Sequence, residues 1–540
     1  MKVINKIFQS AFLYPFLFAL FPILTLWNTN FGRMGNLEII LPITLSLIIS
    51  GVVFLLFRLI LGNWTKSALF TSLLIFLFFS YGHIFNLLVG NSLFGVRENQ
   101  PRNFIVAWLI IFLAGSYLIF RYGKKAGAIN QFLNVVGVAL ILMTGIQIGI
   151  QQIHAANISR QRLQEIAKAG AASANVHLSS NPNSPDVYLI ILDGYMRDDK
   201  LMRSYHFDNS AFLKQLTDMG FVIPSCTQSN YTWTQLSMSS ELNMNYLDSL
   251  GIPLDPTTYT QDFSLLSEFI QHSLVRANFA SLGYKMVTFK TSVEFMDITD
   301  SDIYIQDKTS FWQNFVDTTE FDDMLSQTSI LRLYNYLQQK SPALAKVAAK
   351  AQKVISAISP QNLVQSRSFD EVRYETILND LNQITNVPDI PGKKFVYMHV
   401  PAPHASLHSF FILGPDGSFD FQKSQDIGYP NAVTYLNSRI IPILKTIIAK
   451  SARPPIIILS GDHGWKQSTN TRPFNLNAYY LPDGGSKIIY PTITPVNTFR
   501  SIFNYYFGGN YPQLKNTTYF SKSYYPYKFT EVPIVCPRPK

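Results

Sequence analysis

The sequence has few charged residues. Only 14% of its 540 residues are Asp, Glu, Lys or Arg, whereas a soluble globular protein carries about 25%. The shortfall is concentrated in residues 11–150, which consist mainly of Leu, Ile, Phe, Val and Gly, while the chain after Ser184 has an ordinary globular composition. This distribution excludes a protein that is water-soluble throughout. It predicts an N-terminal membrane part followed by a soluble domain.

Cysteine is also scarce. The two cysteines, Cys226 and Cys536, both lie in the soluble part. Two cysteines exclude a disulfide-rich scaffold, and a single bridge between them remains open in an oxidising compartment. The formal net charge of +10 is not gathered on a recognisable nucleic-acid-binding module, because much of it lies beside apolar runs. We therefore expect no nucleic-acid partner.

Five apolar runs predict membrane spans, because each approaches the roughly 20 residues that cross a hydrocarbon core. The first run is short, and the alternative for it is a cleaved signal peptide. Four further runs follow it and no small-residue cleavage pattern is present, which favours a span. We therefore expect a bundle of five transmembrane helices within residues 1–150, with spans at about 11–27, 39–57, 68–89, 104–120 and 132–150.

The distribution of Lys and Arg predicts how this bundle is oriented. With a cytoplasmic N-terminus, the inside segments carry seven Lys and Arg residues and the outside loops carry three. Positive residues favour the cytoplasmic side of a membrane. An odd number of spans then places the chain after Ile150 outside. We expect a multi-pass protein of the inner (plasma) membrane with a periplasmic or extracellular C-terminal domain.

The soluble part has the pattern of an α/β domain. Residues 151–185 predict a polar helix and a turn-rich linker, and the domain is expected to fill 186–540. A Lys- and Ala-rich helical insertion at about 325–358 predicts either a solvated helical pair that covers the core or a basic surface on anionic lipid. Helical patterns alternate with continuous apolar runs, which are typical of strands buried on both faces of a mostly parallel sheet. These runs are Val187–Leu192, Lys394–Val400 and Ile456–Leu459.

Each of the three predicted strands ends in a polar cluster. Asp193 follows the first strand, His404 follows the second, and Asp462 with His463 follows the third. Ligands of open α/β sheets bind beyond the carboxyl ends of the strands. Carboxylate oxygens together with an imidazole suit Mn²⁺, Mg²⁺ or Zn²⁺. The sequence therefore predicts a divalent metal site at this edge of the sheet.

A hydroxyl nucleophile would complete such a site. The Thr- and Ser-rich segment 230–240 offers several hydroxyl groups, and a nearby metal would lower the pKa of one of them. The alternative is that this segment only caps a helix. His404, and also His408, are candidates to protonate a leaving group or to hold a non-bridging oxygen.

The order of these motifs resembles the alkaline phosphatase superfamily, in its sulfatase-like branch. Five spans before an extracytoplasmic domain resemble the lipoteichoic acid synthase and phosphoethanolamine transferase group within it. The spacing from Thr234 to Ser237 is similar to that family's nucleophile motif. By position, the resemblance implies Asp193, Asp462 and His463 as metal ligands, Thr234 as nucleophile and further ligand, Thr232 as the competing nucleophile, and His404 on the substrate side.

Departures from the family narrow the expected chemistry. Sulfatases oxidise a Cys or Ser to an aldehyde, whereas Thr234 would give a ketone. Leu236 and Met238 replace the Pro and Arg of the sulfatase signature. Two-metal members need a further His after the Asp-His pair, and the sequence has none after His463. The resemblance therefore implies a single divalent ion, and sulfatase activity is disfavoured.

The expected function is metal-dependent transfer of a phospho-headgroup, of phosphoglycerol or phosphoethanolamine type, through a phosphothreonine intermediate. The donor is a membrane lipid, and the acceptor is a glycan, lipid or polymer of the cell envelope. Anchoring the domain beside the bilayer raises the effective concentration of a lipid donor. The alternatives are a hydrolase that uses the same residues, as a phosphodiesterase or phosphatase, and a non-enzymatic membrane assembly protein.

Overall fold

The chain folds into two compact units. The first consists of Met1–Ile153 with Thr309–Phe369, and the second of His154–Lys308 with Asp370–Lys540. The computed structural model describes residues 10–537 except for 33, 36–37, 91–103, 124–126, 173–177, 253, 258–263, 292, 307–316, 341–366, 406–408, 414–418, 423, 467 and 524.

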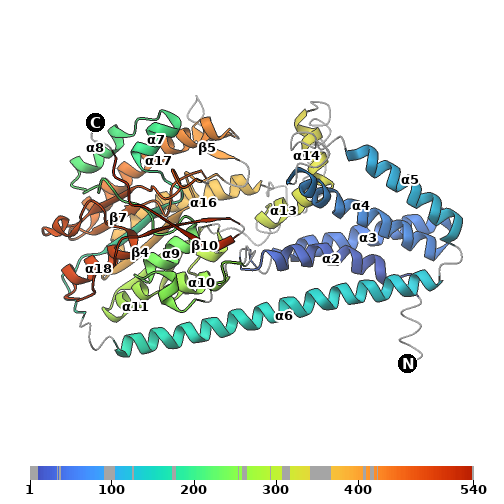
Figure 1. Cartoon of the computed structure of the whole chain (residues 1–540), viewed down its shortest axis with the longest axis horizontal. Helices are drawn as coiled ribbons and strands as arrows, with labels where there is room; N and C mark the ends of the chain where they lie inside the picture. Colours follow the sequence, from blue (N-terminus) through green and yellow to red (C-terminus); the bar gives the residue numbers. More distant parts are fainter. Residues whose placement is uncertain are drawn as a thin grey trace. The chain divides into compact units, whose positions relative to one another are not determined.

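Apolar helices build most of the first unit (Figure 1). Four of them are long and apolar enough to cross a membrane, whereas α2 has 17 residues. Many of their apolar side chains face outward, as on α3, where Leu59 is 81% exposed. The predicted apolar helices are thus confirmed, and the number of spans stays a prediction. The helices are α2 (Leu13–Thr29), α3 (Ile40–Leu61), α4 (Trp64–Gly90), α5 (Ile105–Tyr122) and α6 (Gly127–Ala172).

Local sequence explains where these helices stop and how they adhere. Gly62 ends α3 with a φ of 64°, a conformation that glycine adopts without a side-chain clash. The side chain of Asn63 then accepts a hydrogen bond from the Lys66 amide (2.9 Å) and caps α4. Between α2 and α6, buried Asn134 accepts from the Tyr14 amide at 2.8 Å. Such polar contacts hold helices together where apolar burial gives little preference.

The described part of the expected insertion packs on these helices. It forms α13 (Glu320–Thr328) and α14 (Leu331–Lys340). The Ile330 amide donates to the Phe78 carbonyl of α4 at 2.8 Å, and Leu333 is buried against Tyr81 and Trp108. Of the two alternatives that the sequence left open, the described part does not cover the core of the second unit, because apolar side chains such as Leu333 pack on α4, and contact with anionic lipid stays a prediction. Residues 341–358, with most of the lysines, lie outside the described residues.

Gly82 lets α4 and the end of α13 touch backbone to backbone. A Cβ atom added there would lie 2.4 Å from the carbonyl oxygen of Gln327, and no flexible side chain can yield the space. We predict that Gly82→Leu separates α13 from α4 and destabilises the first unit by about 1–3 kcal/mol or more. Thermal unfolding in detergent and proteolysis of the insertion measure this effect. Gly145→Leu on α6 is the control, because nothing lies within 4 Å of its added Cβ; equal behaviour of both variants would contradict the packing.

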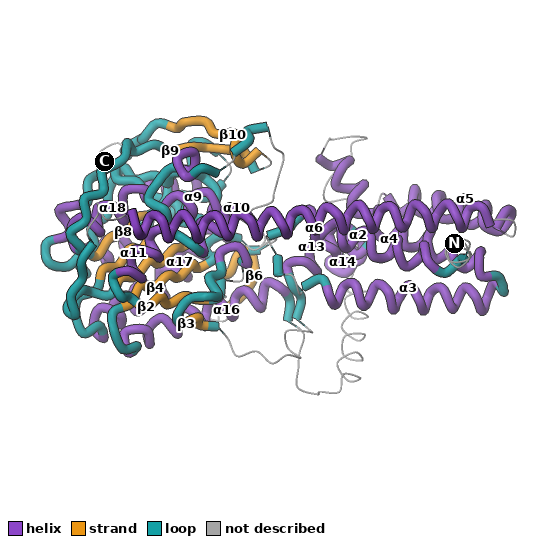
Figure 2. The backbone as a smooth tube through the Cα atoms, turned by 90° about the horizontal axis from the view of Figure 1, so that it is seen from below, coloured by secondary structure: helices purple, strands orange, loops and turns teal. Residues whose placement is uncertain are grey.

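A six-stranded sheet forms the centre of the second unit, and Figure 2 draws its strands in orange. Its order is β3-β2-β4-β1-β7-β8, with every neighbouring pair parallel except β7 and β8. The three strands predicted from the sequence are confirmed as β1, β4 and β7. The strands are β1 (Val187–Leu192), β2 (Lys285–Phe289), β3 (Ile303–Ile305), β4 (Lys394–Val400), β7 (Ile456–Ser460) and β8 (Asn477–Tyr480).

Both faces of this sheet are covered, which explains the continuous apolar runs. In β1, Tyr188, Ile190 and Leu192 enter one core and the alternate residues enter the other. The first face is covered mainly by α7 (Asp198–Tyr205), α8 (Ser210–Asp218), α16 (Phe369–Gln383) and α17 (Gln425–Lys450). The second is covered by α9 (Thr234–Leu242), α10 (Ser264–Gln271), α11 (Leu274–Ser281) and α18 (Pro495–Tyr506).

Helix α6 runs past the expected end of the membrane part. The boundary expected at residue 150 and the start of the linker expected at 151–185 both fall inside this helix. Near its C-terminal end, Arg162 donates to the His272 carbonyl at 3.1 Å and stacks over Phe269 at 4.5 Å. Residues of α6 from His154 onward belong to the second unit, and Arg162 joins this part of the helix to α10 and the turn after it.

Candidate active site

Three adjacent strands bring the predicted ligands together. The strand order β4-β1-β7 sets their carboxyl ends side by side. Asp193 follows β1, His404 lies four residues beyond the end of β4, and Asp462 and His463 follow β7. Register explains the meeting, because Leu192 pairs with Val400 and Ile191 with Ser460. Residues separated by more than 200 positions in the sequence thereby share one edge of the sheet.

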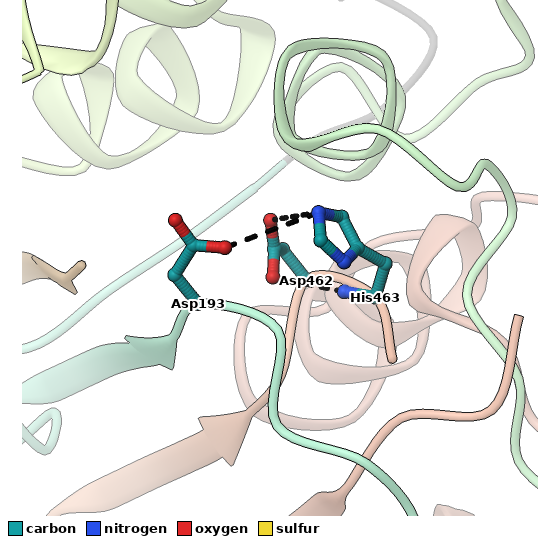
Figure 3. Close-up of side chains that lie close together, drawn as sticks. All are labelled: Asp193, Asp462 and His463. Carbon is teal, nitrogen blue, oxygen red and sulfur yellow. Dashed lines mark hydrogen bonds and ion pairs between the residues drawn. The ribbon is translucent and has the colours of Figure 1, made fainter. Parts of the chain in front are cut away.

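Asp193, Asp462 and His463 form a cluster that fits a divalent cation. One ligand atom of each lies within 4.8 Å of the others. Figure 3 shows His463 Nε2 turned toward both carboxylates, at 3.3 Å from Asp462 Oδ2 and 3.9 Å from Asp193 Oδ1. Asp193 Oδ1 and Asp462 Oδ2 are buried and accept no hydrogen bond in the described part of the chain. Two such oxygens beside an imidazole nitrogen match a hard or borderline metal ion.

The remaining polar atoms of the cluster hold it in place. Asp462 Oδ1 accepts hydrogen bonds from the Gly194 and His463 amides, both at 2.9 Å. His463 Nδ1 lies 2.8 Å from the Gly464 carbonyl oxygen, so this nitrogen carries the proton. Nε2 therefore carries the lone pair, and it is the nitrogen that would bind a metal. Contacts of this kind orient metal ligands and fix their tautomer.

Thr234 is the hydroxyl that the fold brings to this cluster. It begins α9 after extended Trp233, and its Oγ1 lies 3.1 Å from His463 Nε2. The hydroxyl of Thr232 instead accepts a hydrogen bond from the Ser521 amide at 3.4 Å. Ser237, one turn into α9, donates to the Asp462 carbonyl at 2.7 Å and ties the helix to the loop that carries Asp462 and His463. Of the two candidate nucleophiles, Thr234 is the one that faces the cluster.

Burial and mutual charge set the protonation of the two carboxylates. Burial alone would raise the pKa of Asp193, but the neighbouring His404, His399 and His463 hold it below its usual value. Burial and the charge of Asp193 raise the pKa of Asp462 to about 6. Like charges this close do not ionise independently. Bound divalent metal would relieve this repulsion, which is a further reason why the pair fits a cation.

His404 faces the cluster as a neutral group at pH 7. Burial, reinforced by Arg373, lowers its pKa to about 4. Its amide donates to the Asp193 carbonyl at 3.0 Å, and its Nδ1 lies 2.6 Å from the Ala405 carbonyl oxygen. Nε2 is then an acceptor, which suits His404 to take a proton from an incoming hydroxyl. His408 lies outside the described residues.

Three further ionisable residues near the site have no counterpart in the sequence analysis. His399 of β4 is fully buried, with Nε2 3.6 Å from Asp193 Oδ2. Arg472, in the loop between β7 and β8, places Nη2 at 3.3 Å from His463 Nε2. Glu241 of α9 is 2% exposed. Only His399 had an available signal, because a histidine inside an otherwise apolar strand next to the His404 loop is unusual.

Glu241 makes stability depend on pH. Burial, with the charge of Asp462, raises its pKa from 4.5 to about 8. Between these values the folded protein holds a proton that the unfolded chain has lost, so stability falls as pH rises, on the order of 1.4 kcal/mol per pH unit. Asp462 below about pH 6 and His404 below about pH 6.5 also change protonation on unfolding, so we predict that Glu241→Gln removes this slope in thermal unfolding measured from pH 6.5 to 8. Glu531→Gln, at a side chain 57% exposed, should keep it; a slope that persists in Glu241→Gln would refute the assignment.

A C-terminal hairpin and a disulfide support the segment that leads to Thr234. Cys226 and Cys536, 310 positions apart, are bonded, which settles the pairing that the sequence left open. Gln228 accepts from the Val535 amide at 2.7 Å. The hairpin of β9 (Thr518–Lys522) and β10 (Tyr525–Val532) accepts a bond from the Trp233 indole at the Ser521 carbonyl, 2.9 Å away. The tail thus holds the segment before Thr234 in place.

Comparisons with known proteins complete the description of the site. No protein-family model and no curated protein sequence matches the chain. Among solved structures, it is similar to the C-terminal periplasmic domain of EcEptC from Escherichia coli, with 13% identity, 63% of this chain and 91% of that chain covered, and a TM-score of 0.36. At 11% identity it is similar to the integral membrane protein lipooligosaccharide phosphoethanolamine transferase A of Neisseria meningitidis, over 90% and 95% of the chains with a TM-score of 0.34.

A third solved structure is the phosphonate monoester hydrolase of Agrobacterium radiobacter, at 10% identity over 62% of this chain and 80% of that one, with a TM-score of 0.32. Two of these three proteins are named as enzymes, a transferase and a hydrolase of phosphorus compounds. The roles of residues in this chain rest on its own geometry.

Proposed function

We propose that the chain is a membrane-anchored, metal-dependent transferase of the alkaline phosphatase superfamily that moves a phospho-headgroup from a lipid to an acceptor in the cell envelope. The observation that carries the proposal is the position of Thr234. Its hydroxyl lies 3.1 Å from His463 Nε2, beside two buried carboxylate oxygens that have no hydrogen-bond partner in the described chain. A hydroxyl next to a cluster that can hold a metal suits phosphoryl transfer through a covalent intermediate, because metal coordination is one way to activate such a nucleophile.

The residues divide the reaction into two displacements. A divalent ion held by Asp193, Asp462, His463 and Thr234 would lower the pKa of the Thr234 hydroxyl and offset negative charge on a phosphoryl oxygen. Thr234 Oγ1 loses its proton and attacks the phosphorus of the headgroup diester, the bond to the lipid oxygen breaks, and that oxygen takes up a proton in exchange for the one that Thr234 released, so that the lipid leaves as an alcohol. An acceptor hydroxyl then attacks the phosphothreonine, and the bond to Thr234 breaks. His404 Nε2 takes the proton of that acceptor hydroxyl.

The insertion supports the orientation expected from the positive residues. Its ends are continuous with the soluble unit, so it lies on the same side of the membrane as that unit. It contacts the C-terminal half of α4 at Phe78 and the start of α5 at Trp108. With these helix ends outside, the Gly62–Asn63 turn between α3 and α4 is cytoplasmic. If α2 also spans, the N-terminus is cytoplasmic and the total is five spans.

Hydrolysis is the second candidate, because water in place of the acceptor hydroxyl would use the same residues. The apolar helices favour transfer, since placement beside the bilayer benefits an enzyme whose donor is a lipid. A non-enzymatic assembly role is the third, and the convergence of Thr234, Asp193, Asp462, His463 and His404 on one point speaks against it.

Product analysis tests the proposal. The full-length protein is incubated in membranes with a lipid whose phosphoethanolamine or phosphoglycerol headgroup is labelled, together with envelope material. The expected result is label on a glycan, lipid or polymer acceptor and release of the unlabelled lipid alcohol. Free labelled headgroup without labelled acceptor would assign hydrolysis instead, and an unchanged donor would leave neither enzymatic function standing.

A further inference from the structure

Arg472 is a buried cation beside the proposed nucleophile. It lies between β7 and β8 and is 3% exposed. Its Nε donates to the Thr232 carbonyl, and its guanidinium carbon stacks 3.9 Å from the centre of the Trp233 ring. Nη2 lies 3.3 Å from His463 Nε2, the same nitrogen that Thr234 Oγ1 approaches to 3.1 Å. The Arg472 guanidinium and the Thr234 hydroxyl therefore both lie within hydrogen-bond distance of His463 Nε2.

The charge of Arg472 has no ion-pair partner in the described part of the chain. Burial lowers its pKa to about 10, so it stays protonated at neutral pH. A buried charge without a counter-charge is costly. Arg197 shows the contrasting case, because it is equally buried and stacks over Phe474 at 4.8 Å, but it pairs with Asp199 at 2.6 Å.

The groups around the Arg472 guanidinium indicate which kind of anion it can bind. Asp193 and Asp462 attract it from a distance, but in a metal-loaded site their inner oxygens face the ion. The Thr232 carbonyl fixes the Nε edge of the guanidinium, and the Trp233 ring covers one face. Nη2, which lies 3.3 Å from His463 Nε2, remains available to a group bound beside Thr234. A guanidinium fork matches the oxygens of a phosphoryl group in shape and charge.

We propose that Arg472 is a catalytic residue that binds the non-bridging oxygens of the phosphoryl group while it passes to and from Thr234. This inference rests on the proposed function and names the group that recognises its substrate. Negative charge on these oxygens must be stabilised in the transition state by groups that are already in position. Arg472 supplies a positive charge there without a second metal ion, in a chain that has no histidine after His463.

The stack of Trp233 on Arg472 fixes the guanidinium before substrate arrives. Trp233 directly precedes Thr234 and is itself held by the Ser521 carbonyl, at 2.9 Å from its indole nitrogen. One rigid segment therefore positions both the nucleophile and the cation. Groups that need no rearrangement during the reaction give the largest electrostatic benefit.

Equilibrium binding of inorganic phosphate tests this assignment without turnover. Full-length, zinc-loaded protein in detergent is titrated with phosphate by calorimetry, and zinc content and thermal stability are measured in parallel. Arg472→Gln should weaken phosphate binding on the order of 10- to 100-fold, the effect of losing a charged hydrogen bond, with zinc content unchanged. Arg472→Lys keeps the charge without the fork and should retain part of the affinity.

Arg197→Lys is the matched control for replacing a buried, stacked guanidinium. It should lower thermal stability and leave phosphate affinity as in wild type, because Arg197 is already paired. If Arg472→Gln does not fold, Arg472→Lys decides, and phosphate affinity equal to that of wild type overturns the proposal. Wild-type protein that binds no phosphate also overturns it.

The outcome separates this inference from the proposed function. Phosphate binding that depends on Arg472, in a protein whose Thr234 never becomes phosphorylated, would leave the oxyanion site standing while the covalent mechanism fails. Phosphorylation of Thr234 in a protein whose phosphate affinity does not change when Arg472 is replaced would support the covalent mechanism and overturn the role of Arg472.

Discussion

Thr234→Ala should reduce the turnover of a lipid donor by a factor on the order of 10⁴ or more, because it removes the atom that forms the covalent bond to phosphorus. The rate is measured with a headgroup-labelled lipid in the presence of acceptor. Thr234→Ser should retain a large part of the rate, since it keeps the hydroxyl at the start of α9. The two variants therefore differ in which group they remove: Thr234→Ala removes the hydroxyl, and Thr234→Ser removes only the methyl group.

Two controls distinguish this effect from loss of structure. Thr234 is half-buried, so Thr234→Ala should unfold at nearly the wild-type temperature. Thr232→Ala is the matched substitution at the competing hydroxyl, which bonds the Ser521 amide rather than His463. Wild-type turnover by Thr234→Ala, together with loss of turnover by Thr232→Ala, would move the nucleophile to Thr232.

Removal of bound metal should have an effect of similar size. A chelator is expected to lower activity to background, and about one equivalent of Zn²⁺ or Mn²⁺ per chain should restore it. Asp193, Asp462 and His463 each bring a possible ligand atom within 4.8 Å of the others, and without a cation the two carboxylates repel each other. Metal content is measured on purified protein before and after chelation.

The same ligands make metal affinity depend on pH. A metal binds the deprotonated carboxylate, and the pKa of Asp462 in the metal-free site is about 6. Protons therefore compete below about pH 6, and affinity should fall up to about tenfold per pH unit there while it changes little above pH 7. Asp462→Asn should lose both the metal and the activity. Full activity of metal-free protein, or two tightly bound ions per chain, would contradict the single-metal site.

The sequence predicts the sheet and the ligands for a definite physical reason. Strands buried on both faces have no polar alternation, so β1, β4 and β7 appear as continuous apolar runs. The predicted bounds of β1 and β4 are the observed ones, and β7 extends one residue further, to Ser460. The polar residues that follow such runs must lie at one edge, because parallel strands end on the same side. Asp193, Asp462 and His463 therefore come together in the structure as the sequence predicts.

Residues whose roles depend on long-range packing leave no such pattern. Arg472 lies in an irregular loop, and only the fold places it beside His463. Glu241 lies in a helix, and the neighbouring sequence gives no sign that its side chain is buried. The packing of α13 on α4 depends on Gly82, a glycine that any membrane helix tolerates. The bond between Cys226 and Cys536 depends on a C-terminal tail that returns across 310 positions.

Mass spectrometry of protein quenched during turnover tests the central claim most directly. The protein, zinc-loaded and mixed with its lipid donor, is digested, and the peptide that contains Thr234 is examined for added mass. The predicted result is a headgroup phosphate on Thr234 that is absent after chelation and absent from Thr234→Ala. Turnover at the full rate with no adduct on Thr234, or with the adduct on another residue, would contradict the account.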